Sequence, residues 1–470
     1  MFEFFRTWVL PELLSTGAFV LALVFMAAVL KPRQSPAAAT AWLLVIFLLP
    51  YLGVPLFLMF GGRKMRNIVK KKHRLYSKRP GVPTASEGGG IERILDTYGV
   101  PHRSAGNLVR LAGDGVDAFQ DVCRLIDEAE REIHVLSYIL GVDDVGREIV
   151  ARLAKRAGQG IKVRLLLDAM GSWRVKRSFV APLVEAGGEV AYFMPVIHLP
   201  LRGRANLRNH RKILVIDGRV AMLGGMNLAT EYMGPTPDPL RWVDLSVVVE
   251  GPVVQPIDEL FRNDWQFVTG KRIEPIPSRP NEQGSMLSEG GTRTEAQVVA
   301  SGPDVEGDPL YDSLISAIHN AERRLWIVTP YFVPDDTLAR ALELSARRGV
   351  DVRLIVPERS NHLMADIARE SYLKQVQAAG TQVLLYAPVM VHAKVLVIDD
   401  SLAVVGSANM DMRSLFLNYE VALYLSTPSM VESTAEWVSS LFPACRTVIP
   451  KDGRVRELAE GVVRLLSPLL

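Results

Sequence analysis

Uncharged apolar runs fill most of the first 62 residues of the chain. No charged residue occurs from Leu13 to Leu30 or from Gln34 to Gly62. Each run is long enough to cross the hydrocarbon core of a bilayer as a helix, and Pro50 and Pro55 would kink the second helix. The pattern therefore predicts a two-helix transmembrane hairpin over residues 1–62.

Two other interpretations of these runs are open. A cleaved signal peptide fits the first run less well, because the amino end carries Arg6 against Glu3 and Glu12 and because a second apolar run follows at once. Two buried core helices are the third interpretation, which we rank lowest.

The basic residues predict how the hairpin is oriented. The loop between the runs offers Lys31 and Arg33, whereas seven basic residues follow the second run. By the positive-inside rule, residue 63 onward and the amino terminus lie in the cytoplasm. The same residues would face anionic headgroups, where each charge contributes about 1 kcal/mol, unless they serve topology alone. The seven are Arg63, Lys64, Arg66, Lys70, Lys71, Lys72 and Arg74.

Past residue 90 the pattern changes to alternating strands and helices, and this alternation occurs twice. The helix-to-strand segment 127–138 resembles 318–331, and the strand 160–167 is matched by 349–356. A chain of 470 residues is also too long for one ordinary core. We therefore expect an α/β fold with two pseudo-twofold-related α/β/α domains.

Polar stretches rich in Gly, Pro and Ser mark where these domains end. Residues 63–105 are interpreted as the basic juxtamembrane segment with a linker, and residues 271–295 as a second linker. The first α/β/α domain is then expected over 106–270 and the second over 296–470.

The strongest chemical signal is a motif repeated at the end of each half. Its members keep identical gaps in the two copies, and the alternation of a strand places the His and the Lys on one face. A single His-x-Lys is usually a surface pair, but duplication with the same tail predicts a site. The copies are His210, Lys212, Asp217, Gly224, Gly225 and Asn227, and His392, Lys394, Asp399, Gly406, Ser407 and Asn409.

These residue types suit transfer at a phosphodiester. One imidazole can attack phosphorus while the other protonates the departing alkoxide and then activates the acceptor. The two ammonium groups and the amides of Asn227 and Asn409 can stabilise charge on the non-bridging oxygens. Such a site is expected to need no metal ion and no cofactor, because cationic side chains take the role that Mg²⁺ has elsewhere.

Asp217 and Asp399 belong to the catalytic motif, but their position suggests a second role. Each stands at the end of a strand, where an Asx-turn or a local salt bridge is the ordinary function of an aspartate. We expect both carboxylates to support the site's structure rather than to carry protons.

Two further carboxylates are candidates for orienting the histidines. A nucleophilic imidazole needs a hydrogen-bond acceptor on its other nitrogen. Glu420, at the start of an apolar strand, is the candidate for His392, and Asp244 occupies the like place after His210. The alternative is that both are strand-edge carboxylates that face solvent.

Composition narrows the classes of partner. The formal net charge is +3 at pH 7, which gives no basis for nucleic-acid binding through overall charge. The two cysteines, Cys123 and Cys445, stand outside any Cys-x-x-Cys or Cys/His cluster. Neither a zinc site nor a disulfide framework is therefore expected.

At these residues the sequence resembles the phospholipase D superfamily, whose hallmark is a repeated His-x-Lys-x4-Asp motif. It is similar in particular to the bacterial cardiolipin synthase family, and the likeness covers nearly the whole chain, including segments 331–336 and 409–420. The resemblance implies transfer of a phosphatidyl group between two phosphatidylglycerol molecules, with release of glycerol, in the bacterial plasma membrane. It also implies His210 as nucleophile and His392 as acid/base, whereas the residues alone leave the two symmetrical.

The resemblance leaves several points open. Gly225 and Ser407 differ between the copies, and both are expected to contact substrate, so that the two sides of the site are not equivalent. Phosphatidylglycerol and other anionic lipids are the expected partners, and a homo-oligomer is compatible with the sequence. Alternative functions are a phospholipase D that hydrolyses or uses another acceptor, a membrane-tethered nuclease, and a non-catalytic scaffold.

Overall fold

The structure is a computed structural model. It describes residues 16, 17, 20, 36–60, 72, 75, 76, 89–194, 207–276, 285–287 and 290–447. Most of the first apolar run, and every residue of the predicted basic cluster except Lys72, lie outside the described residues. The predicted positions of those segments therefore stay predictions.

The second apolar run forms two short helices, α3 (Pro36–Leu48) and α4 (Pro50–Phe60). Pro50 ends one helix and begins the next, where we expected a kink, because proline has no N–H to continue the first helix and suits the first position of the second. The Trp42 and Phe57 rings meet edge to face at 5.4 Å between centroids, so the two helices pack on each other. Among the described residues, no helix has the length and apolar character needed to cross a bilayer.

The first half of the catalytic body alternates strands and helices, as the sequence predicts. Helix α7 begins where Asp114 accepts hydrogen bonds from the backbone N–H groups of Val116 and Asp117, and it buries one apolar face. The elements are α6 (Gly90–Thr97), β1 (Ser104–Ala112), α7 (Gly115–Glu128), β2 (Glu132–Ser137), α8 (Asp144–Gly158), β3 (Lys162–Asp168), α9 (Arg177–Glu185), β4 (Glu189–Phe193), β5 (Ile213–Ile216), β6 (Val220–Gly224), β7 (Ser246–Glu250) and α10 (Val254–Thr269).

The second half repeats this order with a few additions. Its elements are β8 (Thr292–Ser301), α11 (Pro309–Asn320), β9 (Arg324–Val328), β10 (Phe332–Val333), α12 (Asp336–Arg347), β11 (Asp351–Pro357), α13 (Leu363–Ala378), β12 (Gln382–Tyr386), β13 (Val395–Ile398), β14 (Leu402–Gly406), β15 (Met410–Asp411), α14 (Met412–Phe416), β16 (Glu420–Leu425), α15 (Pro428–Ser439), a 3₁₀ turn (Phe442–Ala444) and β17 (Cys445–Thr447).

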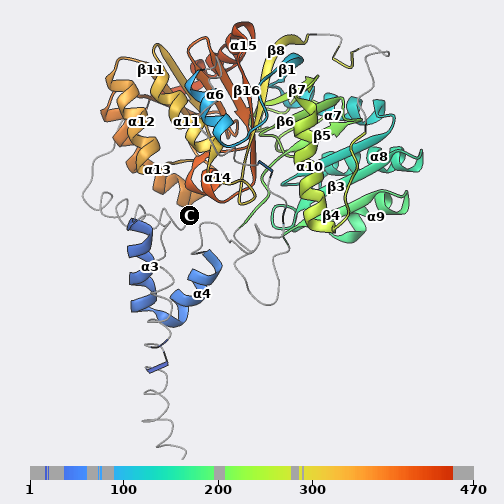
Figure 1. The fold of residues 1–470 in the computed structure, drawn as a ribbon, viewed down its shortest axis with the longest axis horizontal. Coiled ribbons are helices and arrows are strands. Elements are labelled where there is room, and N and C mark those ends of the chain that lie inside the picture. The colour runs from blue at the N-terminus through green and yellow to red at the C-terminus, as the bar shows by residue number, and fades with distance from the viewer. Residues whose placement is uncertain are drawn as a thin grey trace, which may run out of the picture.

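Fifteen of the described strands form one continuous sheet. Its order is β17-β12-β11-β9-β13-β14-β16-β8-β1-β7-β6-β5-β2-β3-β4. The antiparallel pair β8 and β1 lies at the centre, and the strands on either side follow in matching sequence, from β7 and β16 outward. Figure 1 shows the two halves side by side, with helices on the faces of the sheet. The predicted pair of pseudo-twofold α/β domains is confirmed.

The central strands begin earlier than the predicted domain boundaries. β1 begins at Ser104 and β8 at Thr292, each inside a segment predicted as a linker. Their first residues are polar, so the local pattern resembles a loop. They are strands because they pair with each other across the two halves, with Asn107 opposite Thr294. That pairing is a tertiary contact and has no signal in either segment alone.

Candidate active site

The two motif histidines are each anchored by the backbone of the opposite half. The backbone N–H of His210 donates to the carbonyl of Tyr419 at 2.9 Å, and the N–H of His392 donates to the carbonyl of Val243 at 2.7 Å. Isolated parallel bridges join Asn209 to Tyr419 and Val243 to Val391. These reciprocal contacts fix both histidines at the interface, so the repeated motifs build one site.

The orienting carboxylates also cross between the halves. Nδ1 of His210 lies 3.1 Å from Oε2 of Glu420, and Nδ1 of His392 lies 2.7 Å from Oδ2 of Asp244. Both carboxylates were predicted as orienters, but the assignment within each half was wrong. The bridges described above set Asp244 beside one histidine and Glu420 beside the other. With Nδ1 occupied, Nε2 is the nitrogen that each ring keeps for reaction.

Burial and neighbouring charges set the protonation of these pairs. Burial lowers the pKa of His210, and burial together with the Lys394 ammonium lowers the pKa of His392 to about 3. Burial alone would raise the pKa of Asp244 and Glu420, but the cationic groups beside each carboxylate lower both pKa values overall. The lowered pKa values favour a neutral imidazole on each histidine and an ionised form of each carboxylate, and a neutral imidazole is the state that a nucleophile or a base requires.

The two motif lysines are buried beside the histidines. Nζ of Lys212 donates to the carbonyl of His210 at 2.6 Å, and Nζ of Lys394 lies 2.7 Å from Nδ1 of His392. Burial lowers the pKa of Lys212 well below its usual value and the pKa of Lys394 to about 8. An anionic phosphodiester placed between them would raise both pKa values, because an opposite charge favours the protonated amine.

Asn227 and Asn409 each keep one polar atom without a partner among the described residues. Oδ1 of Asn227 accepts from the backbone N–H of Ile139 at 3.1 Å, and its buried Nδ2 makes no hydrogen bond. Nδ2 of Asn409 donates to Oγ of Ser414 at 3.1 Å, and its buried Oδ1 is unpaired. A buried polar atom without a partner costs free energy, so these amides have capacity for a ligand.

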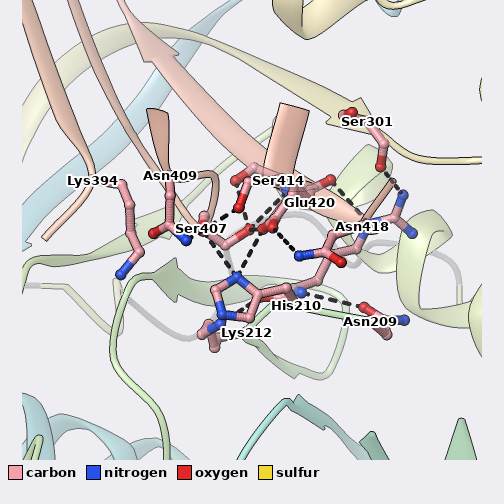
Figure 2. A network of polar contacts seen from close by, with 12 residues as sticks. Asn209, His210, Lys212, Ser301, Lys394, Ser407, Asn409, Ser414, Asn418 and Glu420 are labelled. Carbon is pink, nitrogen blue, oxygen red and sulfur yellow. Dashed lines mark hydrogen bonds and ion pairs between the residues drawn. The ribbon is translucent and has the colours of Figure 1, made fainter. Parts of the chain in front are cut away.

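Ser407 and Gly225 lie against the two orienting carboxylates, and the expectation that they contact substrate stays a prediction. Figure 2 shows Glu420 between Ser407, Asn418 and His210, and the fully buried Ser407 hydroxyl donates to Glu420 Oε2. On the other side, a Cβ at Gly225 would lie 2.1 Å from Oδ1 of Asp244. The copies differ here because a hydroxyl at position 407 binds Glu420, whereas a side chain at position 225 would collide with Asp244.

Asp217 and Asp399 have matching backbone roles. Asp217 accepts from the N–H groups of Glu130, Arg131 and Glu132, and Asp399 accepts from those of residues 322, 323 and 324. Both residues also adopt a positive φ, of 55° and 47°. Each carboxylate holds the turn after its motif strand against the start of the neighbouring strand, which is the supporting role that we predict for it.

Removal of these carboxylates is expected to destabilise the fold more than the chemistry. Asp217→Ala strands three backbone donors next to a buried strand, so we expect a loss of about 3 kcal/mol in the free energy of unfolding. Asp399 is more exposed, and Asp399→Ala should cost about 1 kcal/mol. Thermal unfolding of the purified chain measures both. A large loss of turnover with unchanged unfolding would contradict the supporting role.

Aromatic rings make the two sides of the site unlike each other. The Tyr138 ring meets the edge of His210 at 4.9 Å between centroids. His392 is bordered by both Tyr232 at 5.1 Å and Trp242 at 5.5 Å. Sequence reasoning missed these residues. The one available signal was the place of Tyr138 in the repeat, where Tyr331 is its counterpart in the second half.

A second charged network lies directly behind the site. Arg211, between His210 and Lys212, is fully buried and bonds both carboxylate oxygens of Asp264, at 3.1 and 3.0 Å. Asp264 also accepts from Nδ2 of Asn209 at 2.7 Å. The buried Asp264 carboxylate and the buried Arg211 guanidinium are tolerated in the interior because their charges are paired.

Lys72 supplies the second cation of this network. It was predicted to face lipid headgroups, but it is buried and pairs with Asp264 and, at 2.8 Å, with Oδ2 of Asp304. Its Nζ also lies 4.4 Å from the centroid of the Tyr419 ring. The buried carboxylates of Asp264 and Asp304 need a cationic partner, and this pairing places the Lys72 ammonium in the interior instead of at the membrane surface. Lys72 therefore contacts the catalytic body beside the Arg211–Asp264 pair.

One group of side chains among the described residues has the spacing of a metal site. It consists of Glu132, His134 and Asp258. Nη1 of Arg164 lies 3.0 Å from Nε2 of His134, and Nε of Arg262 lies 3.0 Å from Asp258. These guanidinium groups already supply the positive charge, so we interpret the group as an ion-pair network.

Comparison with known proteins extends over the whole chain. A family described as "Cardiolipin synthase, PLD-like domain" matches residues 122–265 and 314–442, and one described as "Phospholipase_D-nuclease N-terminal" matches residues 19–62. Cardiolipin synthase of Alkalihalophilus pseudofirmus is 32% identical over 99% of this chain and 95% of its own length. Cardiolipin synthase 1 of Bacillus anthracis is 31% identical over 93% of this chain and 90% of its own.

A solved structure supports the fold alone. The crystal structure of phosphatidylserine synthase from Haemophilus influenzae superposes with a TM-score of 0.60, at 14% identity, over 81% of this chain and 100% of that one. At this identity the likeness concerns the arrangement of strands and helices.

Proposed function

The chain belongs to the cardiolipin synthase family of phospholipase-D-like proteins, and we propose that it transfers a phosphatidyl group from one phosphatidylglycerol to another, yielding cardiolipin and glycerol. The observation that carries the proposal is the exchanged pairing of His210 with Glu420 and His392 with Asp244. Two oriented imidazoles at one interface suit a double displacement at phosphorus.

The first half-reaction forms a phospho-histidine. Nε2 of His210 attacks the phosphorus of phosphatidylglycerol, and the bond from phosphorus to the glycerol oxygen breaks. Binding of the anionic phosphodiester favours the protonated form of His392, which then gives its proton to that oxygen, and glycerol leaves. Glu420 stabilises the positive charge that develops on His210. The ammonium groups of Lys212 and Lys394 stabilise the additional charge on the non-bridging oxygens, together with Asn227 and Asn409.

The second half-reaction reverses these roles. Neutral His392 removes a proton from a hydroxyl of a second phosphatidylglycerol, whose oxygen attacks phosphorus and displaces His210. His392 is then protonated again for the next cycle. Ionised Asp244 makes this possible, because it stabilises the imidazolium that forms beside it.

The proposal includes a membrane location. We propose that the apolar amino-terminal region, to which the family match at residues 19–62 also extends, anchors the chain in the bacterial plasma membrane with its catalytic domains in the cytoplasm. Anionic lipids are the proposed partners, and nucleic acid is not one. Substrates that stay in the bilayer favour an enzyme that is held at its surface.

A lipid-product assay tests the reaction. The purified full chain, given phosphatidylglycerol as its sole lipid, should form cardiolipin and glycerol in equal amounts. Both products are measured, the lipid by mass spectrometry and glycerol by an enzymatic assay. Phosphatidic acid as the main product would show that water is the acceptor and would refute the synthase assignment.

A further inference from the structure

Large apolar side chains are exposed at one edge of the catalytic body. Within the described residues of 89–194, 207–276, 285–287 and 290–447, seven such side chains are largely exposed. Six of them stand on or next to loops that follow the strands nearest the site. Trp173 is 69% exposed and Leu363 is 73% exposed. The six are Val142, Met170, Trp173, Leu240, Leu363 and Met364, and the seventh is Val184 in α9.

Topology places these loops at the end of the strands where the site lies, which we call the mouth of the site. β2 and β3 run parallel, and β5 pairs antiparallel with β2, so the start of β5, just after His210, lies beside the carboxyl ends of β2 and β3. The loop with Trp173 follows β3, and the loop before Leu363 follows β11 in the equivalent place. Both loops are therefore at the edge that carries the histidines.

Direct contacts join the first loop to the site and the second loop to Tyr331, the counterpart of Tyr138. Oγ of Ser172, next to Trp173, donates to the carbonyl of Tyr138, whose ring packs against His210. In the other half, the hydroxyl of Tyr331 donates to Asn361 and its ring lies 5.5 Å from that of His362. Trp173 is thus next to a residue that bonds Tyr138, and Leu363 is next to a residue that packs against the counterpart of Tyr138.

The charge around Met170 and Trp173 is basic. No acidic residue occurs from 169 to 184, whereas Arg174, Lys176 and Arg177 are exposed in this segment. The guanidinium of Arg174 lies 5.3 Å over the Trp173 ring. Exposed apolar and aromatic side chains among basic ones are typical of segments that enter the headgroup region of an anionic membrane.

The amino-terminal helices indicate which side faces the membrane. Exposed apolar side chains also occur on α3 and α4, among them Phe47 and Leu48. Figure 1 shows α3 and α4 beyond the end of the body at which α13 and α14 lie, and α13 begins with Leu363. The exposed apolar side chains of α3 and α4 are therefore beyond the end of the body at which α13 lies, the helix whose first residues are Leu363 and Met364.

We propose that Met170, Trp173, Leu363 and Met364 form an interfacial rim that enters the surface of an anionic bilayer and places the mouth of the site on its lipid substrates. The inference rests on the proposed function. A bilayer is the occupant that this position favours, because a second protein copy on both sides of the mouth would block the path by which lipid reaches His210.

The test separates bilayer substrate from dissolved substrate. The full chain and a Trp173→Ser/Leu363→Ser variant are reconstituted in vesicles that contain long-chain phosphatidylglycerol, and are also assayed in detergent with monomeric dihexanoyl phosphatidylglycerol. The variant should form cardiolipin from vesicle lipid at least about fivefold more slowly, because it loses two apolar side chains from the interface. Its rate on the short-chain substrate should stay within about twofold of the unaltered chain.

The matched control is Val184→Ser, which removes an exposed apolar side chain away from the mouth and should change neither rate. Brominated lipids should quench the part of the fluorescence that Trp173→Phe removes. Equal losses on both substrates, or no loss on vesicles, would overturn the rim. A chain that self-associates and shields Trp173 from brominated lipid would also overturn the proposed rim. An unaltered chain that makes no cardiolipin from either substrate would refute the proposed function instead.

Discussion

Replacing either His210 or His392 with alanine is expected to lower cardiolipin formation by about 10⁴-fold or more, because each imidazole performs a step that no neighbour can take over. Turnover of phosphatidylglycerol by the purified chain measures the loss. His102→Ala is the matched control, since His102 is 65% exposed and pairs with Asp96 outside the site. Residual activity within tenfold of the unaltered chain would refute the two-histidine site.

A substrate with a good leaving group distinguishes the two histidines. The p-nitrophenyl ester of phosphatidic acid needs no proton on its leaving group, so attack by the nucleophile does not require the acid. The His392→Ala chain should therefore release about one nitrophenolate per site in a burst and retain a phosphatidyl group on His210. The His210→Ala chain should show no burst. The reverse result would assign the nucleophile to His392.

Neutralising the orienting carboxylates should slow the reaction by about 10²- to 10⁴-fold, with each variant affecting the histidine of the opposite half. Glu420→Gln removes the charge beside His210 and should slow the nitrophenolate burst itself. Asp244→Asn removes the charge beside His392 and should leave the burst intact while slowing steady turnover. Rapid-mixing kinetics separate the two phases.

The control for these variants is Asp144→Asn, because the Asp144 side chain is 93% exposed and pairs with Arg147 on the surface of α8. It should change neither phase. If Glu420→Gln instead spares the burst and Asp244→Asn abolishes it, the carboxylates act within their own halves. That outcome would contradict the contacts of 3.1 and 2.7 Å that join the halves.

Local patterns were sufficient for much of the fold. Apolar runs such as those of β5 and β13 form strands that are buried on both faces of the sheet. Their alternation with amphipathic helices is a short-range signal. The polar beginnings of β1 and β8 carried no such signal, because their pairing depends on residues far apart in the chain. The predicted position of Lys72 was wrong for the same reason, because its partners Asp264 and Asp304 are more than 190 residues away in the chain.

The sequence by itself determined that this protein carries a duplicated α/β unit and a paired His-x-Lys chemistry, because repeats, periodicity and motif spacing are properties of neighbouring residues. It also indicated Asp244 and Glu420 as candidates for orienting the histidines. The tertiary structure alone decided their partners: the bridges from Asn209 to Tyr419 and from Val243 to Val391 cross the interface. Those contacts follow from how the two domains pack. A symmetrical motif contains no information about whether each carboxylate pairs with the histidine of its own half or of the opposite half.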